Sequence, residues 1–176
     1  MTTKKICINA MGIALFVVCS LCLQVPVFQN YYLCLGYVVM AFYLYYFGTF
    51  SGTIAGSLGV VIYCLIIGGL RGMPGWALGN LLIGILCGVA SAIAHKQKNR
   101  KIKYVFMFAA VVVSVALGIL VTKSMVETVL YGIPFFIRVM TNLYAFIADV
   151  VVLFGGFVLC ISSEPLFRRL IPEDTR

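Results

Sequence analysis

Six long apolar segments follow one another along the chain, and they constrain the fold more than any other feature of the sequence. They cover residues 6–23, 33–47, 50–70, 76–95, 104–122 and 136–161. The first would rise ~27 Å as a helix, close to the about 30 Å of a bilayer's hydrocarbon core. Because that core offers no hydrogen-bond partners, each segment must pair its own backbone groups. The pattern therefore predicts membrane-spanning helices.

The composition supports an integral membrane protein rather than a soluble domain. Hydrophobic residues make up 63% of the 176 positions and charged residues only 10%, against roughly 25% charged residues in soluble domains. Long unbroken runs favour helices over a barrel, whose strands would alternate. We predict an all-α bundle of six transmembrane helices that forms one domain over residues 1–176. No A-x-A-like cleavage site follows the first run, so we expect that run to be retained.

The basic residues predict an orientation for this bundle, because lysine and arginine accumulate in cytoplasmic loops. With the N-terminus inside, ten of the thirteen basic residues lie on the cytoplasmic side: Lys4, Lys5, Lys96, Lys98, Arg100, Lys101, Lys103, Arg168, Arg169 and Arg176. Both termini are then cytoplasmic. The net charge of +8 reflects topology and contact with anionic lipid headgroups, and no nucleic-acid partner is expected. A docking surface for a partner protein is the alternative for residues 95–103.

Motifs for catalysis are absent from the sequence. No G-x-x-x-x-G-K-[ST] loop occurs, so ATP-driven work is expected to belong to another subunit. His95, the single histidine, lies at the predicted cytoplasmic edge, and the seven cysteines lack the paired spacing of a zinc site. We predict a protein that is not an enzyme and that needs neither a metal nor a cofactor.

The last segment carries a polar stripe. At ~100° per residue, Arg138, Asn142 and Asp149 fall within about 40° of one another around a helix. Ionisable groups inside spans are costly and usually face the bundle interior or a cavity. One interpretation makes Arg138 and Asn142 contacts in an externally open pocket, with Asp149 at its floor. In the other, Arg138 snorkels to the interface and Asp149 makes a structural hydrogen bond.

A second polar group interrupts the chain at GMPGWALGN, residues 72–80. We expect residues 71–75 to form an external turn in which Pro74 fixes φ. Trp76 and Asn80 are one helical turn apart, so they present an aromatic plane beside an amide near the outer surface. An aromatic-belt role for Trp76 is the alternative. Together with the stripe of the last segment, this pair predicts a common pocket.

The external loops add further candidate ligand contacts. The first loop, QVPVFQNYY at residues 24–32, contributes Gln29, Asn30 and Tyr31, and Arg71 lies in the next loop. The first loop has a composition suited to closing over a small solute, although such loops are also simply interfacial.

Small residues at intervals of four predict close helix packing. They are Gly48, Gly52 and Gly56, Gly84 and Gly88, and Ala10 and Ala14. The alanine pair in the first segment is the one that could instead meet another membrane protein.

These features together resemble the substrate-binding S components of energy-coupling factor (ECF) vitamin transporters. The resemblance covers nearly the whole chain: a basic start, Ala10-x-x-x-Ala14, a polar first external loop, six spans and a P-G-aromatic turn before the fourth. PGWALGN is similar to the P-G-F-T-L-S-type turn of folate-specific members. Residues 76–80 depart from that pattern, which argues against folate.

The resemblance implies a function and a set of partners. A transmembrane T subunit would contact Ala10 and Ala14, two ATPases would supply energy, and a water-soluble vitamin or precursor would bind near the external face of a prokaryotic plasma membrane. Two external-side arginines favour a ligand with a carboxylate or phosphate, such as pantothenate or a folate-like compound, while neutral riboflavin, pyridoxine and a queuosine precursor stay open.

Two other functions compete with this prediction. A self-sufficient secondary transporter would use Asp149 to carry a coupling proton. A structural membrane scaffold would bind no ligand and would need Ala10 and Ala14 for assembly alone.

Overall fold

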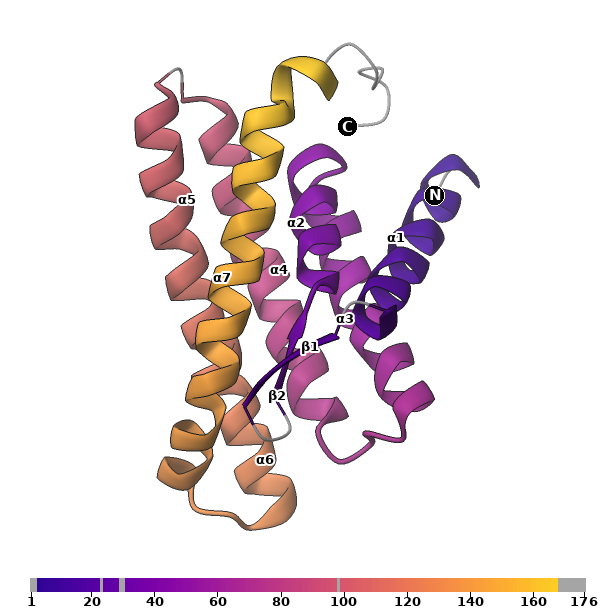
Figure 1. The fold of residues 1–176 in the computed structure, drawn as a ribbon, viewed down its shortest axis with the longest axis vertical. Coiled ribbons are helices and arrows are strands. Elements are labelled where there is room, and N and C mark those ends of the chain that lie inside the picture. Colours follow the sequence, from indigo (N-terminus) through magenta and orange to yellow (C-terminus); the bar gives the residue numbers. More distant parts are fainter. Residues whose placement is uncertain (1–2, 23, 29–30, 98, 168–176) are drawn as a thin grey trace.

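The protein is a bundle of helices with a short β-hairpin laid across it (Figure 1). The computed structural model describes residues 3–22, 24–28, 31–97 and 99–167, with backbone alone for 24–28, 31–33 and 166–167. The elements are α1 (Thr3–Cys22), β1 (Gln24–Phe28), β2 (Tyr31–Cys34), α2 (Gly36–Tyr46), α3 (Thr49–Ile67), α4 (Met73–His95), α5 (Arg100–Val115), the π-helix η1 (Ala116–Lys123), α6 (Ser124–Tyr131) and α7 (Phe135–Phe167).

Five helices have the length and hydropathy to cross a membrane, which confirms a multi-pass helical protein. They are α1, α3, α4, the continuous helix from α5 through η1 to α6, and α7. The predicted second segment, residues 33–47, is instead the end of β2 followed by the 11-residue α2. At 1.5 Å per residue α2 spans ~16 Å, about half of a bilayer core. A sixth full-length span is therefore not present among the described residues.

The hairpin is an addition to the predicted helical fold. β1 and β2 pair antiparallel, with Gln24 opposite Cys34 and Val25 opposite Leu33. The pairing satisfies backbone groups of the predicted first external loop that would otherwise lie unpaired beside apolar helices. The chain thereby enters α2 from a paired strand.

Helix ends follow local sequence signals. Gly68 ends α3 at φ 72° and Gly132 ends α6 at φ 67°, a left-handed conformation that favours glycine. Asn99 caps α5 by accepting a hydrogen bond from the Lys101 backbone N–H at 3.0 Å. Pro74 lies in the first turn of α4, where its missing N–H costs nothing. The predicted turn at 71–75 therefore ends earlier, because Met73 already begins the helix.

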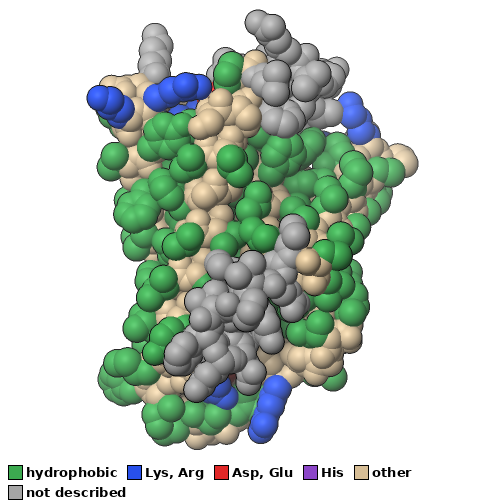
Figure 2. All heavy atoms as spheres, viewed as in Figure 1, with side chains coloured by type: hydrophobic (Ala, Val, Ile, Leu, Met, Phe, Trp, Pro, Cys, Tyr) green, Lys and Arg blue, Asp and Glu red, His purple; other side chains and the backbone are tan. Residues whose placement is uncertain are grey.

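The two ends of the bundle differ in charge, and we name them accordingly. The start of α1, the turn between α4 and α5 and the end of α7 lie together at one end (Figure 1), which carries Lys4, Lys5, Lys96, Arg100 and Lys101 and is called the basic end. The α3–α4 and α6–α7 turns lie at the far end. Hydrophobic side chains cover the visible sides between basic patches at both ends (Figure 2). The predicted orientation across the membrane stays a prediction.

Glycines mark the closest helix contacts, as their spacing predicts. A Cβ on Gly52 would lie 2.5 Å from the Leu44 side chain of α2, and one on Gly84 would lie 2.6 Å from the Thr53 side chain of α3. Gly48 has a different role, because it stands at φ 90° ahead of α3 with open space around it. The core that these contacts enclose includes Phe16, Tyr37, Met40, Ile83 and Phe157.

Candidate functional site

Tyr37 connects α2 to α4 in a buried polar cluster at the far end. The Trp76 indole Nε1 donates to the Tyr37 hydroxyl oxygen at 2.9 Å, and that hydroxyl donates to Asn80 Oδ1 at 2.7 Å. The Asn80 amide in turn donates to the Gly56 carbonyl of α3 at 3.2 Å. Tyr37 and Asn80 are both fully buried. Three helices are therefore joined by one hydrogen-bonded chain of side chains.

A second polar cluster joins α6 to α7. The Asn142 amide donates to Ser124 Oγ at 3.0 Å and to Glu127 Oε2 at 3.3 Å. Arg138 Nε lies 3.7 Å from the same Glu127 oxygen, an ion pair too long for a hydrogen bond. That Nε is buried without a hydrogen-bond partner among the described residues. A buried N–H donor of this kind indicates a missing acceptor.

Lys123 lies between the two clusters. Its ammonium stands 5.9 Å from the centre of the Trp76 ring, and it interacts electrostatically with Glu127 and Asp149. Asp149, on α7, also interacts with Tyr37. The two clusters thus form one continuous polar region, called here the far-end cluster: Tyr37, Trp76, Asn80, Lys123, Glu127, Arg138, Asn142 and Asp149.

The π-helix η1 shapes this region. The Thr122 and Ser124 hydroxyls each donate to the carbonyl five residues earlier, at 2.9 Å and 3.4 Å, which matches the wider turn of a π-helix. A Cβ on Gly79 would lie only 2.7 Å from the Gly118 carbonyl oxygen. The backbones of α4 and η1 therefore touch, and this contact brings Lys123 against the start of α4.

Five of the residues predicted to bind the ligand lie in the far-end cluster, and the others lie outside it. Trp76, Asn80, Asn142, Asp149 and Arg138 lie in the far-end cluster, with Asn80, Asn142 and Asp149 buried. The stripe on the last helix thus faces the interior.

The other predicted contacts lie outside the far-end cluster. Arg71 is exposed in the α3–α4 turn, where its guanidinium lies 5.4 Å from the Tyr131 ring centre. Gln29 and Asn30 lie outside the described residues, and Tyr31 is described by its backbone in β2.

The two residues predicted to couple to a partner lie on an open face. Ala10 and Ala14 of α1 are both exposed, and only 28% of the most apolar 18-residue stretch of α1 is buried. The opposite face of α1 is packed, since Phe16 fits against Gly59 and Gly36. One side of α1 is therefore available to a neighbour in the membrane.

A family model for the S component of ECF-type riboflavin transporters matches residues 1–162. The chain belongs to this family. It is therefore a substrate-binding transporter component rather than an enzyme, which confirms the resemblance drawn from the sequence. Comparison with curated proteins found no match.

Sequence reasoning missed several members of the S component's far-end cluster. The fifth predicted segment ended at residue 122, but the helix continues to Tyr131, so Lys123 lies within it. Lys123 and Glu127 are four residues apart, a spacing that pairs opposite charges on a helix and could have revealed this continuation. Tyr37 carried no comparable signal, because its role depends on the contact between α2 and α4.

Proposed function

We propose that this S component captures a water-soluble vitamin at the far end of the bundle and delivers it inward together with a T subunit and two ATPases. The far-end cluster is the observation that carries the proposal. It gathers an indole, two amides, two cations and two carboxylates from α4, η1, α6 and α7 at the same end of the bundle as Tyr37 of α2, which bonds to Trp76 and Asn80. Such a concentration of polar groups within apolar helices is costly and usually serves a function.

Riboflavin is the substrate we test first, because the family description names it. Its flat ring system would suit the Trp76 indole, and its imide and hydroxyl groups would suit amide and guanidinium partners. Arg138 is the contact we assign with most weight, since its buried Nε has no partner among the described residues. Arg71, Gln29, Asn30 and Tyr31 complete the proposed entrance.

Calorimetry on the purified chain in detergent tests this assignment. We expect riboflavin to bind at a single site, and Arg138→Gln to weaken binding by roughly 1.5–3 kcal/mol, the usual worth of a hydrogen bond to a charged group. Lys101→Gln is the matched control, because Lys101 is an exposed cation at the other end of the bundle. An equal loss of affinity in both variants would contradict the proposal. So would a folded preparation that binds no water-soluble vitamin.

Coupling to the transporter is a separate part of the proposal. Tryptophan at both Ala10 and Ala14 should abolish ATP-driven uptake and spare binding, because bulky rings prevent close helix approach. Val105→Trp is the control, since Val105 is 70% exposed on α5. Uptake driven by a pH gradient without ATPases, and lost in Asp149→Asn, would instead favour a proton-coupled transporter.

A further inference from the structure

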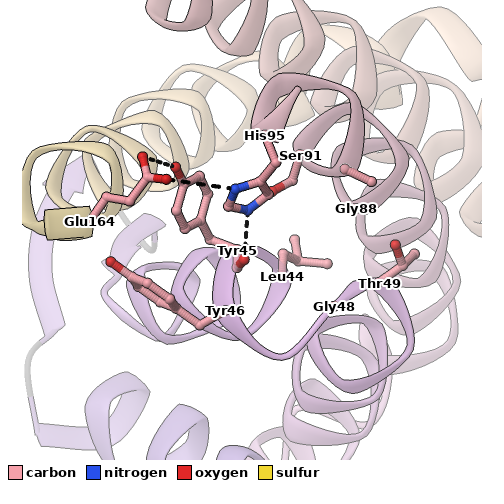
Figure 3. Close-up of a pocket in the computed structure, with 10 residues that line it drawn as sticks. Leu44, Tyr45, Tyr46, Gly48, Thr49, Gly88, Ser91, His95 and Glu164 are labelled. Atoms are coloured by element: carbon pink, nitrogen blue, oxygen red, sulfur yellow. Dashed lines mark hydrogen bonds and ion pairs between the residues drawn. The ribbon is translucent and has the colours of Figure 1, made fainter. Parts of the chain in front are cut away.

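A cavity of about 380 Å³ opens at the basic end, far from the proposed vitamin site. Its walls come from the end of α2, the start of α3, the last turns of α4 and the end of α7 (Figure 3). Trp76 and His95 are 19 positions apart on α4, so the two sites are separated by ~28 Å along that helix. No residue of the far-end cluster lines this cavity.

Ser91 gives the cavity an unused hydrogen-bonding group. Its side chain is 1% exposed and lines the cavity. Its hydroxyl has no hydrogen-bond partner among the described residues. Ser91 and His95 are one helical turn apart on the same face of α4, and the two side chains lie next to each other (Figure 3). A buried hydroxyl without a partner indicates a group that is missing from the cavity.

A second cavity of about 530 Å³ adjoins the first and shares His95 and Glu164 with it. Its wall adds three basic side chains: Lys96, Arg100 and Lys103. The two cavities meet at His95 and Glu164 and are called here the basic-end path, with the basic side chains on one side of these residues and the Ser91 hydroxyl on the other.

The charges along the basic-end path do not cancel. The Lys103 ammonium donates to Glu164 Oε2 at 2.8 Å, and the Tyr45 hydroxyl donates to the same oxygen at 2.9 Å. That carboxylate is thus already compensated. Lys96 and Arg100 form no ion pair with an acidic side chain in the described part of the chain, and Arg100 makes only a 3.5 Å hydrogen bond to the Ile161 carbonyl. Two positive charges remain for an anion.

We infer that this path binds a phosphate ester with a hydroxylated, uncharged portion. The phosphate would lie at Lys96 and Arg100, where a guanidinium suits its geometry. The hydroxylated portion would enter the inner cavity and bond to the Ser91 hydroxyl. Two sources share this chemistry: a phospholipid headgroup of the adjacent leaflet and a soluble phosphate ester.

The test uses the full chain and two probes. Glycerol 3-phosphate is titrated by calorimetry against protein in non-ionic detergent. In parallel, the unfolding midpoint is measured in nanodiscs of phosphatidylcholine with and without phosphatidylglycerol. Arg100→Gln and Ser91→Ala are compared with Lys101→Gln, which removes an exposed charge next to Arg100 that does not line the path.

We expect one probe at least to bind the wild-type protein. Affinity should fall about tenfold in Arg100→Gln, as for a charge-assisted contact, and about threefold or more in Ser91→Ala, with Lys101→Gln unchanged. A response to glycerol 3-phosphate identifies a soluble ester, and a response to phosphatidylglycerol alone identifies a headgroup. The inference is overturned if neither probe binds the wild-type protein. It is also overturned if the affinity falls as much in Lys101→Gln as in Arg100→Gln, or if Ser91→Ala binds with the affinity of the wild type.

Discussion

The far end and the basic end of the bundle both contain a glutamate paired with basic side chains, but they enclose it differently. The Glu127 side chain is 7% exposed between α6 and α7, where Arg138, Asn142 and Lys123 surround it. The Glu164 side chain is 15% exposed and lines two open cavities. The same pairing thus holds helices together at one end and forms the wall of an open site at the other.

Depth in the bundle explains why the two glutamates should respond differently to mutation. Removing one partner of a buried ion pair leaves the other charge uncompensated in a low dielectric. Glu164 lines two open cavities, so water can replace its carboxylate beside Lys103, although the Lys103 side chain is itself only 5% exposed. The comparison therefore predicts a graded series of effects on stability and binding.

The largest expected effect is that of Glu127→Gln. We expect it to lower the free energy of unfolding by roughly 3–5 kcal/mol, because Arg138 and Lys123 lose their shared acidic partner. Glu164→Gln should cost about 1.5–3 kcal/mol, the worth of hydrogen bonds to a charged group. Denaturant unfolding of both variants in the same detergent measures the difference, and a larger loss for Glu164→Gln would reverse the comparison.

The contact between α4 and η1 gives the next largest effect. Gly79→Ala should destabilise by roughly 1–3 kcal/mol, because its Cβ would press on the Gly118 backbone, which can move only by shifting a helix. Gly155→Ala on α7 is the control, since a Cβ there meets nothing within 4 Å. Thermal unfolding of the two variants is compared with the wild type. Equal midpoints for both variants would show that the helices do not touch at Gly79.

Tyr37→Phe tests the hydrogen-bonded chain between α2 and α4. Loss of the hydroxyl leaves Asn80 Oδ1 and Trp76 Nε1 without their partner, so we expect a cost of about 1–3 kcal/mol. Tyr43→Phe on the same helix should change stability by no more than about 0.5 kcal/mol, because no hydrogen bond between described residues uses its hydroxyl. Chemical unfolding monitored by circular dichroism distinguishes the two. Identical behaviour would remove Tyr37 from the network.

The smallest effect is expected at Arg71, in the exposed turn. Its contact with the Tyr131 ring is worth about 0.5–1 kcal/mol at most, so Arg71→Ala should leave the unfolding midpoint nearly unchanged. Calorimetry then asks whether Arg71 also contributes to vitamin binding. An affinity loss as large as that of Arg138→Gln would extend the site to the α3–α4 turn.

The sequence predicted the far-end cluster in part, for a clear physical reason. An amide or carboxylate in an apolar helix must find a partner, so Asn80, Asn142 and Asp149 could be expected to face the interior. Lys123 and Glu127 were missed because the fifth predicted segment ended at residue 122, before both of them. Their burial depends on the α4–η1 contact, which no local pattern encodes.

The second predicted span, residues 33–47, is helical over only part of its length. Residues 33–47 are apolar enough for a span, but α2 begins only at Gly36 because the hairpin takes up the preceding residues. Tyrosine and valine are common in strands, so QVPVF and YYLC carried a strand signal on either side of Asn30. Hydropathy alone cannot separate a paired strand from a helical turn.

Trp76 is the single tryptophan of the chain, so its fluorescence reports on the far-end cluster alone. The most direct measurement is the Trp76 fluorescence lifetime during a riboflavin titration of the detergent-purified protein. We predict a saturable shortening that reaches its limit at one riboflavin per chain, together with a weaker apparent affinity in Arg138→Gln. Binding detected by calorimetry while the lifetime stays unchanged would place the vitamin elsewhere and contradict the account.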